Sequence, residues 1–151
     1  MIGGLYSSLA EPCDSKASAI EVNNLTTVSV SEEILKKVAQ KVLENENEKE
    51  ANLSIALVGQ GRIRELNKKY RGKNRVTDVL AFPGDGLGEI VICSKEVKQN
   101  AKRFDSTFGK ELARVLIHGI LHLLDYDHET SLKKAKLMQK KEEYYLSQLK
   151  I

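Results

Sequence analysis

The spacing of apolar residues along the chain predicts short strands that alternate with amphipathic helices. Apolar residues that recur every three or four positions mark one face of a helix, and alternation with polar residues marks a strand. The expected helices cover residues 34–42, 63–70, 94–104, 108–124 and 130–149. The expected strands cover residues 20–22 with 25–28, 53–58, 77–82 and 87–93.

This order of elements predicts an α+β fold in which about five helices pack on a small, mixed, four-stranded sheet. The helix over 108–124 is the most apolar and is therefore expected to be central and mostly buried. A turn over 83–86 predicts that the strands on either side of it form a hairpin. Ser29 or Ser31 is expected to begin the first helix and Ser94 the third, because hydroxyl side chains bond to first-turn amides.

The remaining segments are polar or lack any period. The highly charged run 44–50 is expected to be a solvated connector, and residues 1–19 a poorly ordered leader. Residues 20–151 are expected to form a single domain, since 151 residues, 41% of them hydrophobic, are enough for one core. No apolar run is long enough for a membrane helix. The two cysteines, Cys13 and Cys93, do not suggest a disulfide framework, which favours the cytoplasm.

The positive charge is concentrated in one short stretch. The whole chain carries a formal charge of +3, whereas residues 62–75 contain seven basic residues against the single acid Glu65, a net charge of +6. Such a cluster is typical of phosphate binding, although a solvated helix face would have the same composition. Arg71, Lys73 and Arg75 alternate around Gly72, which favours an exposed basic loop.

All three histidines of the protein fall within eleven residues. His118 and His122 are four positions apart on the apolar helix, so their imidazoles share one face. The helix must then end, and the turn that follows can bring His128 back as a third ligand. Three neutral nitrogen donors suit zinc, and other divalent transition metals are possible. Three protein ligands leave a position for water, whose pKa the metal lowers toward about 7, unless Cys93 approaches as a fourth ligand.

The histidine spacing also matches that of metzincin proteases, with one difference. In those enzymes a glutamate follows the first histidine and acts as the general base. Here Gly119 occupies that position, so the same protease mechanism is not available. We interpret the missing side chain as space that a bulky nucleic-acid substrate could use.

Three blocks of sequence resemble one known family. The segment His118–His128 is similar to the signature H-G-x-L-H-L-x-G-Y-D-H of the YbeY family, and residues 66–83 and 87–93 resemble its two other blocks. The likeness runs from about Ile20 to the C-terminus. Two positions depart from the family pattern: Asp125 replaces a glycine where we expect a left-handed turn, and Val76 replaces a proline.

The resemblance implies a metal-dependent endoribonuclease that cuts single-stranded RNA. It implies a role in maturation of ribosomal RNA (rRNA), notably the 3′ end of the small-subunit RNA, and in ribosome quality control. The small ribosomal subunit is therefore an expected partner. The resemblance also implies a zincin-like arrangement, with zinc (Zn²⁺) held at the end of the central helix by His118, His122 and His128, and a functional Arg71.

Chemistry suggests roles for the neighbouring side chains. The guanidinium of Arg71 can stabilise charge that develops on a phosphodiester, while Lys73 and Arg75 are expected to bind the RNA backbone. Arg71, His118 and Asp127 are the expected catalytic residues. Asp127 could orient a ligand histidine, act as a base on the metal's water, or cap the turn.

Several other assignments stay open at this point. Asp78 and Glu89 could lie near the site or be structural. Tyr70 and Tyr126 could stack on bases, although packing within its own helix is favoured for Tyr70. Two other functions are also consistent with the sequence: a zinc peptidase-like hydrolase, and a non-catalytic RNA-binding assembly factor whose metal is structural.

Overall fold

A computed structural model describes residues 19–48, 50–126 and 131–149 of the chain. These residues form four strands and five helices. The strands are β1 (Ala19–Asn24), β2 (Asn52–Val58), β3 (Val79–Pro83) and β4 (Gly88–Cys93). The helices are α2 (Glu32–Asn45), α3 (Gln60–Arg71), α4 (Ser94–Arg103), α5 (Phe108–Leu123) and α6 (Leu132–Ser147).

The strands form one mixed sheet in the order β1-β2-β4-β3. β1 and β4 each pair in parallel with β2, and β3 pairs antiparallel with β4 as the expected hairpin. Ile90 of β4 is opposite Ile55 on one side and Ala81 on the other, so it lies at the middle of the sheet. The predicted α+β class, with a mixed four-stranded sheet and five helices, is confirmed for the described residues.

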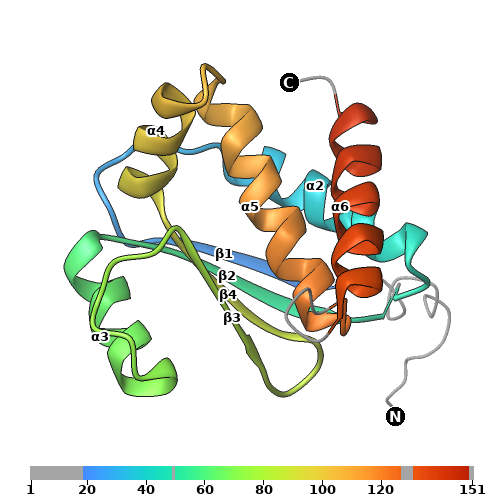
Figure 1. The fold of residues 1–151 in the computed structure, drawn as a ribbon, viewed down its shortest axis with the longest axis horizontal. Coiled ribbons are helices and arrows are strands. Elements are labelled where there is room, and N and C mark those ends of the chain that lie inside the picture. Colours follow the sequence, from blue (N-terminus) through green and yellow to red (C-terminus); the bar gives the residue numbers. More distant parts are fainter. Residues whose placement is uncertain (1–18, 49, 127–130, 150–151) are drawn as a thin grey trace, which may run out of the picture.

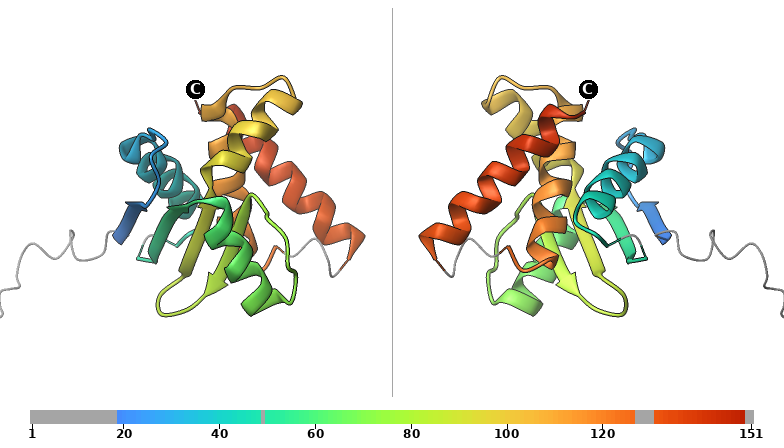
Figure 2. Two further views of the ribbon diagram at one scale, coloured as in Figure 1. Left: turned by 90° about the vertical axis from the view of Figure 1, so that its left-hand side faces the viewer. Right: turned by 90° about the vertical axis from the view of Figure 1, so that its right-hand side faces the viewer.

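The helices are divided unequally between the two faces of the sheet (Figures 1 and 2). α2, α4, α5 and α6 lie on one side, and α3 lies alone on the other. Side chains of β4 alternate accordingly: Ile90 and Ile92 enter the large core, whereas Val91 and Cys93 join a smaller cluster with Ile63 of α3. A strand that is buried on both faces in this way is expected to be almost wholly apolar, as β4 is.

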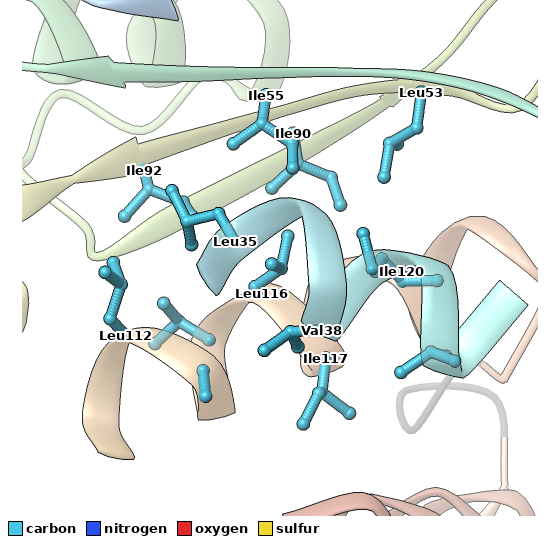
Figure 3. Close-up of a cluster of buried hydrophobic side chains, with 14 of the residues drawn as sticks. Leu35, Val38, Leu53, Ile55, Ile90, Ile92, Leu112, Leu116, Ile117 and Ile120 are labelled. Carbon is cyan, nitrogen blue, oxygen red and sulfur yellow. The ribbon is translucent and has the colours of Figure 1, made fainter. Parts of the chain in front are cut away.

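The large core lies between the sheet and α5 (Figure 3). Leu116, Ile117 and Ile120 of α5 have no exposed surface, and α2 contributes Leu35 and Val38. Burying each such side chain contributes roughly 2 kcal/mol, so this contact fixes α5 against the sheet. The expectation that α5 is the central buried helix is therefore correct.

Helix beginnings follow the sequence in part. The Ser31 side chain accepts a hydrogen bond from the Ile34 N–H (3.3 Å) and begins α2 as expected. The prediction for Ser94 is wrong, because Ser94 is already inside the first turn of α4 and Cys93 is the residue before it. Residues 25–28 are not a strand either: the side chain of Asn24 bonds to the carbonyl of Val28 and closes a turn (2.9 Å).

Membrane insertion finds no support in the part of the chain that the structure describes. None of its helices combines the length and the apolar character that crossing a bilayer needs.

Candidate active site

A cleft of about 530 Å³ opens between the edge strand β3 and α5. Val79 and Ala81 of β3 form one wall, and the histidine-bearing face of α5 forms the other. The loop after α3, the end of α4 and Glu142 of α6 also line the cleft. Elements that are far apart in sequence therefore build one polar hollow on the helix-rich side of the sheet.

One face of α5 supplies four polar side chains to the cleft. Glu111, Arg114, His118 and His122 lie three or four positions apart, so they follow one another along the same side of the helix. The opposite side carries the apolar residues of the core. The burial that orients α5 thus also aims these four side chains into the cleft.

The two described histidines lie side by side, as their spacing predicts. The ring centroids of His118 and His122 are 6.5 Å apart and the ring planes differ by 17°. His118 Nδ1 lies 2.9 Å from Oε2 of Glu142, whose side chain is 15% exposed. A carboxylate at this distance favours the tautomer with its proton on Nδ1, in which Nε2 is the nitrogen that can coordinate a metal.

The third expected ligand lies outside the described residues, as does Asp127. The set of His118, His122 and His128 therefore stays a prediction, and the described residues alone contain no group of three side chains able to hold a metal. Cys93 does not approach as a further ligand, because it is fully buried on the α3 side of the sheet. Burial also raises the pKa of its thiol.

The residues present fit a transition metal as far as they are described. Two imidazoles that share a tetrahedral ion, at about 2.1 Å from each nitrogen, have ring centroids roughly 5.5 Å apart. The observed 6.5 Å requires only a small rotation of the side chains. The carboxylate on Nδ1 of His118 is the partner that metal-binding histidines usually have.

The basic loop reaches the cleft with two of its three expected residues. Arg71 and Lys73 line the cleft, whereas the exposed Arg75 does not. Gly72 has φ +70° and ends α3, which allows the chain to turn toward β3. The amide of Asn67 donates to the carbonyl of Arg75 (2.9 Å) and holds the loop to α3.

Asp78 and Glu89, which the sequence left open, lie on opposite faces of the sheet. Asp78 lines the cleft and accepts a long hydrogen bond from the amide of Asn100 (3.4 Å). Glu89 lines a different hollow beside α3. Gly119 lines the cleft and has a packing role besides the expected one: a Cβ added there would lie 3.1 Å from Ile90 Cδ1, so the glycine lets α5 approach the sheet.

Sequence reasoning missed four charged side chains of the cleft. Arg103 and Arg114 add positive charge, and Glu111 and Glu142 add carboxylates. Glu111 and Arg114 could have been found, because they precede His118 by seven and four positions on the same helix face. Burial raises the pKa of Glu111, although the guanidinium of Arg114, 3.5 Å away, opposes that shift.

Comparisons with known proteins identify relatives of this chain. The family model described as Endoribonuclease YbeY matches residues 19–150. The Endoribonuclease YbeY of Thermodesulfovibrio yellowstonii is 51% identical over 106 residues, 65% of this chain and 67% of the relative. That of Thermotoga maritima is 43% identical over 122 residues, 72% and 81% of the two chains. A Thermotoga maritima protein whose solution structure is known superimposes with a TM-score of 0.61 and 37% identity, over 85% and 86% of the two chains.

Proposed function

The chain belongs to the YbeY endoribonuclease family, and from this premise we propose that it is a metal-dependent endoribonuclease acting on single-stranded RNA. The observation that carries the proposal is one cleft that holds the paired rings of His118 and His122 next to Arg71 and Lys73. Nitrogen ligands beside guanidinium and ammonium groups suit a phosphodiester better than a peptide bond, because the substrate itself is anionic.

His118, His122 and His128 would hold the metal, with zinc as the first candidate. When bound, a divalent ion in this position supplies Lewis-acid chemistry: it polarises a phosphoryl oxygen and acidifies a water molecule. Glu142 keeps the proton of His118 on Nδ1 and restrains rotation of the ring through the 2.9 Å contact. In this tautomer Nε2 is the nitrogen by which His118 would coordinate the ion.

The cations of the cleft bind and orient the substrate. Arg71 donates to the non-bridging oxygens of the reacting phosphate, where negative charge grows in the transition state. Lys73 and Arg114 lie on the same cleft and bind the backbone phosphates that flank it. Arg75, being exposed outside the cleft, would contact the RNA farther from the cut. Asp127 stays a candidate for orienting a ligand or for accepting a proton.

The substrate that we propose is rRNA, with a cut near the 3′ end of the small-subunit RNA. Ribosome quality control and contact with the small subunit in the cytoplasm belong to the same proposal. Its support is membership of the family. The cations described in the cleft recognise phosphates, which every RNA shares, so they do not by themselves select this site.

Cleavage of a labelled single-stranded RNA tests the activity. Zinc-loaded protein should cut, whereas chelated protein and the His118→Ala variant should bind RNA without cutting it. Mapping the product ends distinguishes attack by water, which leaves a 5′ or 3′ monophosphate, from attack by the RNA 2′-hydroxyl, which leaves a 2′,3′-cyclic phosphate. Folded protein that binds RNA but never cuts it, with any divalent metal, would favour the assembly-factor function instead.

A further inference from the structure

A second hollow of about 500 Å³ lies on the other face of the sheet, beside α3. We call it the outer groove. Leu66 and Tyr70 of α3 form one side, and Phe82 of β3 and Val91 of β4 form its floor. Arg62 and Glu89 are the charged residues that line it. Among the described helices only α3 lies on this face, and it covers part of the sheet (Figure 2).

Neighbouring residues connect the outer groove with the cleft. Tyr70 lines the groove and Arg71, the next residue, lines the cleft. On β3, Phe82 lines the groove and Ala81 lines the cleft, because successive side chains of a strand point to opposite faces. β3 is the edge strand of the sheet, so the two hollows are separated by one strand and the loop that precedes it.

The chemistry of the outer groove combines an accessible aromatic ring with positive charge. Tyr70 is 59% exposed, although sequence analysis favoured packing for it. Its ring meets that of Phe82 edge to face, with centroids 5.3 Å apart, and Lys69 Nζ lies 5.2 Å from the centre of the Tyr70 ring. α3 carries five basic residues against Glu65: Arg62, Arg64, Lys68, Lys69 and Arg71.

These properties are those of sites that bind single-stranded nucleic acid. Such sites stack bases on aromatic side chains and follow the backbone with cations, without reading the sequence. Burying Tyr70 against an apolar protein surface would instead leave the surrounding charges of α3 without counterions. The positive charge next to the ring therefore favours RNA over a hydrophobic protein partner.

We propose that the outer groove is a nucleobase-binding subsite for the RNA strand that is cut in the cleft. The strand crosses the basic loop at the sheet edge and stacks one base on Tyr70, with Arg62 and Lys69 facing its phosphates. This inference rests on the proposed function, because it assigns a second contact to the same substrate. RNA long enough to reach both hollows binds more tightly than RNA that fills the cleft alone.

Steady-state cleavage of single-stranded RNAs of graded length tests the subsite. Tyr70→Ala should raise KM for a long RNA roughly 5- to 100-fold, the range that loss of one stacked base produces. The effect should fall mainly on KM, since a remote contact is equal in the ground and transition states. Tyr70→Phe keeps the ring and should restore the wild-type KM. Tyr144→Ala is the matched control, because Tyr144 on α6 is 53% exposed and meets Tyr145 edge to face at the same 5.3 Å.

Photocrosslinking of the wild-type enzyme gives a second, direct measurement. RNA that carries 5-iodouridine should crosslink to a peptide containing Tyr70 or Phe82. If the wild-type enzyme cuts RNA while Tyr70→Ala has a normal KM and the crosslinks fall elsewhere, the subsite is disproved and the proposed function stands. If the wild-type protein neither binds nor cuts RNA with any divalent metal, both proposals fail together.

Discussion

Two glutamates at one turn of α6 have different surroundings: Glu46 contacts this turn from outside, and Glu142 belongs to it. Glu46, just after α2, has a side chain that is 7% exposed and accepts hydrogen bonds from Lys141 (2.8 Å), Tyr126 (2.8 Å) and Tyr145. Glu142 follows Lys141 directly on α6, and its Oε2 lies 2.9 Å from Nδ1 of His118 on the wall of the cleft. Neighbouring positions of α6 are therefore tied to two separate polar groups.

Their surroundings indicate that Glu46 stabilises the fold, whereas Glu142 orients a side chain of the site. Burial alone would raise the pKa of Glu46, but the bonds from Lys141, Tyr145 and Tyr126 outweigh it and lower that pKa. Glu46 is thus an ionised centre that joins α2, α6 and the segment after α5. Glu142 has its histidine partner in an open cleft, where water can solvate both groups, so its removal affects orientation more than stability.

We expect the largest loss of stability from Glu46→Ala. The substitution leaves one ammonium and two hydroxyl groups without their buried acceptor, so we expect a loss of about 3 to 5 kcal/mol in the free energy of unfolding. Urea denaturation measures it. Glu33→Ala is the control, because Glu33 is 78% exposed and its pair with Lys37 contributes well under about 1 kcal/mol. A loss below 1 kcal/mol for Glu46→Ala would mean that this centre is not structural.

Glu142→Gln tests whether the second carboxylate orients His118. A glutamine cannot hold the proton on Nδ1 of His118 as a carboxylate does, so zinc affinity should fall about 10- to 100-fold. The unfolding free energy of the metal-free protein should change by less than about 1 kcal/mol. Competition with a chromogenic chelator measures the affinity. Glu143→Gln is the matched control, since the exposed Glu143 bonds to Gln139 of its own helix; equal zinc binding by both variants would contradict the role of Glu142.

The two glutamates also show what the sequence could and could not predict. The periodicity of α5 predicted that His118 and His122 share a face, because helix geometry is local. The contact with Glu142 depends on how α6 packs against α5, and no local pattern encodes that packing. Glu46 lies in the charged run 44–50, which we expected to be solvated. Its described neighbours are exposed, and the tertiary contacts of one residue make it the exception.

For the fold as well, local sequence patterns were predictive, whereas long-range pairing could not be predicted. The limits of β2 and β4 were predicted to within one residue from alternation, and the hairpin of β3 and β4 from a turn, whereas β3 begins two residues later than expected. The parallel pairing of β2 with both β1 and β4 was not, because parallel register depends on crossover connections that leave no short-range signal. The charge pattern predicted the basic loop, but only the structure shows that Arg71 and Lys73 line the cleft and that Arg75 does not.

The dependence of stability on pH gives a further test of the surroundings of Glu46. A lowered pKa means that ionised Glu46 stabilises the fold above the ordinary value of 4.5, and that this stability is lost as the pH falls through the folded pKa. The advantage of wild type over Glu46→Gln should be about 1 to 2 kcal/mol at pH 7 and should shrink below pH 4.5. Urea denaturation across this range measures the difference. For Glu111 we expect stability to change with pH in the opposite direction.

The raised pKa of Glu111 makes its ionised form unfavourable in the fold, so its cost grows as the pH rises above 4.5. Glu111→Gln should therefore gain stability relative to wild type as the pH rises above 4.5, whereas Glu46→Gln should lose stability relative to wild type as the pH rises toward 4.5 from below. Parallel pH curves for the two variants would contradict the different surroundings inferred for the two carboxyl groups.

The smallest effect concerns the turn that connects the two polar groups. Asp125 has φ +69°, as expected where the family has a glycine. The N–H of Asp125 donates to the carbonyl of His122 and that of Tyr126 to Leu121, which is the Schellman ending of a helix. Asp125→Gly relieves the left-handed backbone but loosens the unfolded chain, so we expect a gain of about 0.5 kcal/mol in urea denaturation.

Asp105 is the matched control for this turn, because it ends α4 with φ +53° and the same pair of bonds, through Lys102 and Ala101. The backbone argument is identical at the two positions, so Asp105→Gly should gain as much as Asp125→Gly. Asp125, however, lies between His122 of the cleft and Tyr126, which bonds to Glu46. A gain at Asp105 combined with a loss at Asp125 would therefore mean that the Asp125 carboxylate itself helps to hold the cleft and the Glu46 centre together.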